Sequence, residues 1–132
     1  MPTNIESSLR RGSERARTTA HTSALQISAQ DLSGELARVL GRQLVALIVG
    51  KAPRTIIRWV EGSSAPSQDD ERVLRDAYQI YFMLSPIEGD HTIRAWFMGM
   101  NPQLEDEAPA EALAKGHARD VMAAARAFVN GG

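Results

Sequence analysis

Apolar residues recur every three or four positions from Ser28 onward, and this spacing predicts α-helices. The first predicted helix begins at Ser28, a residue type that often caps a helix, and runs to Gly41. A second apolar run covers residues 44–49. A third helix is predicted to begin at Pro53, because proline fits the first turn of a helix, and to end at Gly62.

The remainder of the chain continues the helical pattern. A longer helix is predicted after Ser67, with acidic residues in its first turn, and it stops at Ser85-Pro86. Another begins at Asp90 and ends before Asn101-Pro102. Two alanine-rich helices, separated by Gly116, complete the chain: residues 108–115 and 117–129. No segment alternates like a β-strand, so the sequence predicts an all-α fold of about seven short helices.

Composition narrows the possible classes of protein. The 132 residues contain no cysteine, which removes disulfides, thiolate metal sites and cysteine nucleophiles. No apolar stretch approaches the roughly 18 residues of a membrane-spanning helix, and no hydrophobic signal sequence opens the chain. We therefore expect a cytoplasmic protein with no membrane partner.

Charge and polarity divide the chain into regions. Residues 1–24 are polar and lack apolar periodicity, so a flexible tail is expected there. Residues 28–67 carry five basic and three acidic side chains, a net charge of +2, whereas residues 68–132 carry six and eleven, a net charge of −5. Two surfaces with different partners, or chance segregation of charge, would both give this asymmetry. The predicted domains are 25–86, which holds the helix-turn-helix described next, and 87–132, a small helical interaction domain.

The segment from residue 43 to residue 62 has the spacing of a helix-turn-helix. Ala46 is small enough for a second helix to cross closely, and Gly50 permits a turn with positive φ. Ile56 and Trp59 would hold the second helix against the core. If these two side chains face inward, the helical period turns four others outward: Arg54, Ile57, Arg58 and Glu61.

Arginine near the start of a recognition helix binds guanine through two hydrogen bonds, while basic residues around the helix contact phosphates. We expect phosphate contacts from Arg38, Arg42 and Lys51. Solvated arginines on an amphipathic helix would give the same pattern. One motif reads few base pairs, so a homodimer on operator DNA is expected. The candidate DNA-binding residues are Arg42, Lys51, Pro53, Arg54, Thr55, Ile57 and Arg58.

Two segments together resemble the Xre/MbcA/ParS-type antitoxins, over roughly residues 30–129. Residues 52–59, which read Ala-Pro-Arg-Thr-Ile-Ile-Arg-Trp, look like the Xre/Cro-like helix-turn-helix of the MbcA branch, as do Gly62 and Pro66. The C-terminal half resembles the family's toxin-binding region in a series of residues: Arg94-Ala95-Trp96-Phe97, Asn101-Pro102-x-Leu104, Pro109, Leu113, Gly116 and a final helix with Val121.

This resemblance implies an antitoxin of a type II toxin–antitoxin system. Such a protein would bind and neutralise a RES-domain toxin, an enzyme that destroys cellular NAD, and would repress the shared operon. A homodimer or a larger hetero-oligomer with the toxin is expected. By position, the toxin contacts are Trp96, Phe97, Met98, Met100, Asn101, Pro102, Leu104, Leu113, Gly116, Arg119, Met122 and Arg126. Four of these side chains would serve equally well as core residues: Trp96, Phe97, Leu104 and Leu113.

The chain departs from the family pattern at three places. Glu105-Asp106-Glu107 stand where the family often has glycines, and Ala110 stands where a larger apolar residue is expected. Ala52 stands where serine commonly caps the recognition helix, which weakens that helix start by about 1 kcal/mol. These departures leave the identity of the toxin open.

No pattern of catalytic residues is present. The three histidines (His21, His91 and His117) lack the spacing of metal ligands, and no glycine-rich phosphate loop occurs. We expect no enzymatic activity, no metal and no cofactor. Two alternatives to the antitoxin remain open. One is a stand-alone helix-turn-helix repressor, such as a phage-type immunity regulator, whose C-terminal half mediates oligomerisation. The other is an interaction adaptor that never binds DNA.

Overall fold

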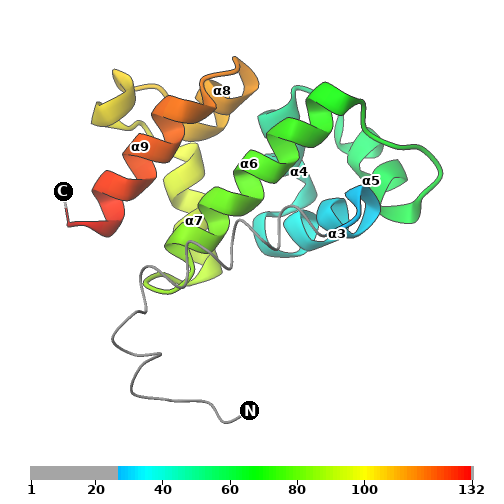
Figure 1. Cartoon of the computed structure of the whole chain (residues 1–132), viewed down its shortest axis with the longest axis horizontal. Helices are drawn as coiled ribbons and strands as arrows, with labels where there is room; N and C mark the ends of the chain where they lie inside the picture. Colours follow the sequence, from blue (N-terminus) through cyan, green and yellow to red (C-terminus); the bar gives the residue numbers. More distant parts are fainter. Residues whose placement is uncertain (1–26, 132) are drawn as a thin grey trace, which may run out of the picture.

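The computed structural model describes residues 27–131 (Figure 1). Within these residues the secondary structure is helical, with seven α-helices and no strand, which confirms the predicted all-α fold. The flexible tail predicted for residues 1–24 lies outside the described residues. The helices are α3 (Ala29–Leu40), α4 (Arg42–Val49), α5 (Pro53–Glu61), α6 (Gln68–Leu84), α7 (Asp90–Met98), the 3-10 helix η1 (Pro102–Leu104), α8 (Pro109–Ala114) and α9 (Ala118–Val129).

Local side-chain contacts and glycines set several of the helix ends. The Ser28 hydroxyl accepts a hydrogen bond from the backbone N–H of Asp31 at 3.1 Å, and the Ser67 hydroxyl accepts one from Asp70 at 3.1 Å. Each bond satisfies a donor that has no partner inside its own helix. α5 ends at Gly62, whose φ of 83° is a left-handed value that favours glycine. These ends agree with those predicted from the sequence.

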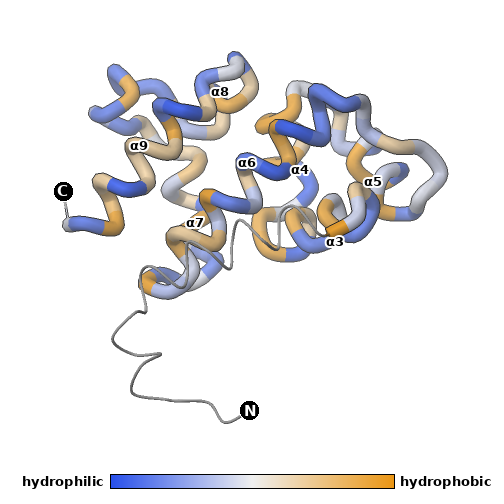
Figure 2. Tube along the Cα trace, in the orientation of Figure 1, coloured by the Kyte–Doolittle hydropathy of each residue, from blue (hydrophilic) through white to orange (hydrophobic). Residues whose placement is uncertain are grey.

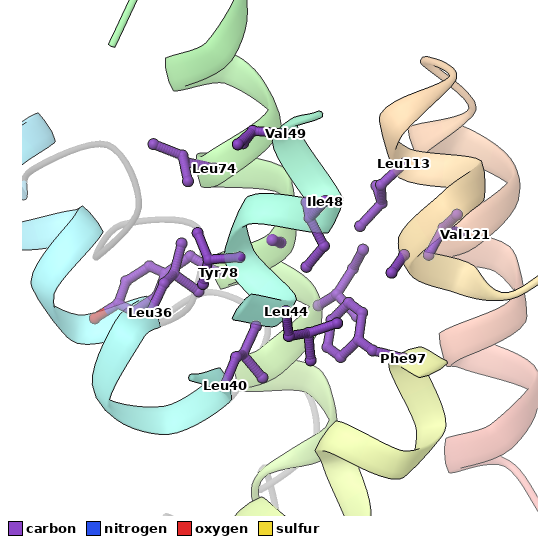
Figure 3. Close-up of a cluster of buried hydrophobic side chains, with 14 of the residues drawn as sticks. Leu36, Leu40, Leu44, Ile48, Val49, Leu74, Tyr78, Phe97, Leu113 and Val121 are labelled. Carbon is purple, nitrogen blue, oxygen red and sulfur yellow. The ribbon is translucent and has the colours of Figure 1, made fainter. Parts of the chain in front are cut away.

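α6 crosses the middle of the molecule, with α3, α4 and α5 on one side and α7, α8 and α9 on the other (Figure 1). One cluster of buried apolar side chains joins the two sides. Figure 3 shows part of it, with labelled side chains from six helices, among them Leu36, Ile48, Phe97, Leu113 and Val121. The described residues of the two predicted domains, 25–86 and 87–132, therefore share a hydrophobic core.

The helices carry one apolar face each. Hydrophilic and hydrophobic residues alternate along α6 and α9 (Figure 2), as expected of helices that lie with one face on a core. Among residues 27–131, no helix is both long enough and apolar enough to cross a membrane.

Polar contacts also hold α7 against the rest of the protein. The Tyr81 hydroxyl on α6 donates a 2.6 Å hydrogen bond to Oδ1 of Asp90, at the start of α7. Burial, together with this hydrogen bond, raises the pKa of Tyr81 to about 12. One turn further on, Nε of Arg94 donates to the carbonyl oxygen of Val39 at 2.9 Å, near the end of α3. These bonds link α7 to both α3 and α6.

Candidate nucleic-acid interface and partner surface

α4 and α5 are connected by three residues, Gly50, Lys51 and Ala52. Gly50 has a φ of 70°, the left-handed conformation that its place in the sequence predicts. The backbone N–H of Lys51 donates to the carbonyl oxygen of Ala46 at 2.9 Å and closes the turn. Ala46 itself is buried on α4. The result is a tight turn between two helices that contact each other.

The orientation of α5 follows its sequence. Ile56 and Trp59 are buried, with 0% and 3% of their surface exposed, so they fix this helix to the core. Gln30 adds a polar contact, because its side-chain Nε2 donates to the carbonyl oxygen of Val60 at 3.0 Å. The residues predicted to face outward are exposed except for Ile57, which is half-buried: Arg54, Ile57, Arg58 and Glu61. We call these four residues the α5 stripe.

Arg42, Arg54 and Arg58, at this end of the molecule, have no charged partner within the described part of the chain. All three side chains are exposed. A phosphate or a base could therefore bind their guanidinium groups without breaking an existing ion pair.

The other predicted DNA contacts at this end are placed differently. A guanidinium nitrogen of Arg38 lies 2.8 Å from Oε1 of Glu35, and Nζ of Lys51 lies 3.5 Å from Oδ2 of Asp70. Each basic side chain would have to give up its ion pair in order to bind a phosphate. Pro53 is exposed at the first turn of α5, and Thr55 is half-buried.

A shallow depression lies between α3 and α5. Arg42, at the start of α4, lines this depression together with Ile57 and Glu61 of the α5 stripe. The depression is lined by Ala37, Arg42, Ile56, Ile57, Val60 and Glu61. Arg42 therefore shares this surface with Ile57 and Glu61 of the α5 stripe, and the surface combines charged groups of both signs with a small apolar area.

The predicted toxin contacts divide into core and surface residues. Phe97, Leu104 and Leu113 are 0%, 9% and 1% exposed, so their side chains hold α7, η1 and α8 together in the free chain. Half-buried side chains form a second group: Trp96, Asn101 and Met122. The remainder are exposed: Met98, Met100, Pro102, Gly116, Arg119 and Arg126.

Three of the exposed residues, Met98, Met100 and Pro102, lie close in sequence to a fixed turn. The Asn101 side chain accepts a hydrogen bond from the backbone N–H of Gln103 at 2.9 Å, which forms a tight turn at Asn101-Pro102. Met98 and Met100, just before this turn, are 57% and 80% exposed. Trp96 contributes less surface, since its ring lies against Phe97 with ring centroids 5.3 Å apart.

Two features of these surfaces were not predicted. Gln30 fixes the end of α5 from a position 30 residues earlier in the chain, and local patterns carry no signal for such a contact. Glu105 and Asp106 have left-handed φ values of 55° and 69°. The family that the sequence resembles often has glycines at this place. Because glycine adopts left-handed φ values easily, those glycines are a signal that could have indicated this backbone conformation.

No family model, no curated protein and no solved structure matches this chain. In the described part of the chain, histidine and carboxylate side chains do not gather in any group of three or more that could hold a metal ion.

Proposed function

We propose that this protein is the antitoxin of a type II toxin–antitoxin system. In this proposal α4 and α5 act as a helix-turn-helix that binds operator DNA, and the C-terminal half binds and neutralises a RES-type toxin. The observation that carries the proposal is a pair of exposed arginines on α5, Arg54 and Arg58, which have no ion-pair partner among residues 27–131 and lie on a helix anchored by buried Ile56 and Trp59.

Charge along α5 favours one orientation on DNA. Arg54 is the second residue of the helix, and the helix dipole adds partial positive charge at the same end. Glu61 places a negative charge at the opposite end, where it would repel phosphates. The start of α5 would therefore enter the major groove, as recognition helices do, with Arg42 on the phosphate backbone.

The proposed toxin contact draws support from the surface around Met98 and Met100. Flexible, polarizable methionine side chains adapt well to a protein partner. Exposed acidic groups at Glu105, Asp106 and Glu111 lie nearby in the sequence and would complement a basic nucleotide pocket. α5 and α9 lie at opposite ends of the molecule (Figure 1), which would let DNA and a protein partner bind together.

Purification of the tagged full chain from its native host tests the toxin assignment. We expect a RES-domain protein to co-purify with the wild type and to be lost from the double variant Met98→Asp, Met100→Asp. Ile87→Asp is the matched control, because Ile87 is 49% exposed and lies outside the proposed contact. Recovery of DNA without any RES-domain protein would contradict the toxin assignment.

A stand-alone repressor is the second candidate, and one observation favours it. Phe97, Leu104 and Leu113, which the resemblance assigns to the toxin contact, are already used in the chain's own core. This candidate predicts that the purified chain alone occupies several neighbouring operator copies. An adaptor that never binds DNA would instead show no salt-sensitive binding to any duplex.

A further inference from the structure

Ile57 is the apolar member of the α5 stripe. It follows Arg54 by one helical turn, so the two side chains lie on the same side of α5. It remains half-buried, whereas the charged members of the stripe are exposed. Part of its hydrocarbon surface is therefore available to a ligand that approaches α5.

The surroundings of Ile57 define the kind of group that fits there. On one side lies the depression between α3 and α5, where Ala37 and Val60 add apolar surface, Arg42 adds a cation and Glu61 adds a carboxylate. On the other side lies Arg54. A DNA strand held by Arg42 would thus bring the edge of a base next to Ile57 while Arg54 contacts a neighbouring base.

An isoleucine side chain has no hydrogen-bonding atom, so it distinguishes bases only through an apolar contact. Thymine alone among the four bases presents an apolar group, the 5-methyl, in the major groove. We infer that Ile57 is a specificity-determining residue that packs against the 5-methyl group of a thymine in the operator half-site. This inference rests on the proposed binding of DNA by α5.

Replacing thymine by deoxyuridine tests the contact without changing the protein, since it removes only the methyl group. Duplexes are first selected from a random pool with the full chain, and each thymine is then replaced in turn. We expect one position per half-site at which replacement weakens wild-type binding about fourfold. Burial of one methyl carbon is worth ~0.8 kcal/mol, and about 1.4 kcal/mol corresponds to a tenfold change in affinity.

Two variants assign the effect to a side chain. Ile57→Ala should bind the thymine and deoxyuridine duplexes equally. Ile87→Ala, which changes a distant exposed isoleucine, should keep the fourfold difference. Circular dichroism confirms that each variant is folded.

The outcomes separate this inference from the proposed function. Selected duplexes whose thymines can all be replaced without loss would overturn the role of Ile57 while leaving DNA binding intact. A fourfold difference that persists in Ile57→Ala would overturn it as well. Failure to select any duplex would overturn both the DNA-binding proposal and this inference.

Discussion

The side-chain amide of Gln30 occupies the space that a β-carbon on residue 62 would need, with Nε2 2.8 Å from that position. The same nitrogen donates to the carbonyl oxygen of Val60, so the absence of a side chain at Gly62 allows α3 to hold the end of α5. Glycine is favoured here chiefly because its φ of 83° is left-handed, and a β-carbon would in addition displace the amide of the flexible Gln30 side chain.

Gly62→Ala should therefore lower the free energy of unfolding by about 1–2 kcal/mol, measured by urea denaturation. Gly34→Ala is the matched control on the same α3–α5 contact. A β-carbon at residue 34 would meet only Val60 Cγ1 at 4.0 Å, and alanine favours a helix interior, so a gain of about 0.5–1 kcal/mol is expected. Equal effects of the two substitutions would contradict the role of Gln30 and Gly62.

Glu105 adopts a backbone conformation that glycine adopts more easily. Its φ is 55°, in the left-handed region. Glu105→Gly should raise the free energy of unfolding by about 1 kcal/mol, because the strain of the β-carbon is removed. The same substitution inside α8, Glu111→Gly, should lower it by a similar amount. Thermal unfolding of both variants tests whether their stabilities change in opposite directions. A loss of stability in Glu105→Gly would refute the explanation.

Ala52 precedes α5 in the same extended conformation that Ser28 and Ser67 adopt before α3 and α6, but it has no side-chain oxygen to cap the helix. Ala52→Ser should stabilise the fold by ~1 kcal/mol, since its hydroxyl can accept from the backbone N–H of Thr55. Ser28→Ala should show the reverse change. Denaturant midpoints measure both, and an unchanged midpoint for Ala52→Ser would count against this helix start.

Stability should depend on Tyr81 at alkaline pH. The pKa of Tyr81 is about 12 in the folded protein, raised from 10.0 by burial and by the hydrogen bond to Asp90. The unfolded chain therefore loses this proton first as the pH rises. The stabilisation is complete below pH 10 and is lost as the pH rises through about 12.

Urea unfolding across this interval should show a steeper fall in stability for the wild type than for Tyr81→Phe. Burial also raises the pKa of Tyr78, but Tyr78 is present in both proteins and largely cancels in the comparison. Below the interval, Tyr81→Phe should be the less stable protein by about 1 kcal/mol, the worth of one hydrogen bond. Parallel pH profiles would argue against the contact with Asp90.

Local signals predicted most helix ends. Serine caps, a proline at the first turn of α5 and glycines at its end act within a few residues, so their effects are visible in the sequence. The packing of α8 with α4 was not predictable, because it joins residues far apart in the chain, such as Leu113 and Ile48. This distant packing is why two predicted domains share a core.

The surface residues also divide into those that local patterns predict and those that depend on tertiary packing. Helical period alone predicted that Arg54 and Arg58 would be exposed, and the buried positions of Ile56 and Trp59 agree with it. The pairing of Arg38 with Glu35 was missed although their spacing of three residues on a helix is a known signal. The burial of the predicted toxin contacts depends on tertiary packing, which periodicity does not specify.

The insertion of α5 into the major groove is tested most directly by comparing Arg54→Ala with Arg42→Ala on a selected duplex and on its scrambled sequence. Arg54→Ala should reduce the preference for the selected duplex about tenfold or more. Arg42→Ala should weaken binding to both duplexes alike. The fall of log affinity with log salt should become less steep, by about 0.9. Arg119→Ala, a distant exposed and unpaired arginine among the described residues, should change neither quantity. Wild-type affinity and preference in both Arg54→Ala and Arg58→Ala would contradict the assignment of α5 as the recognition helix.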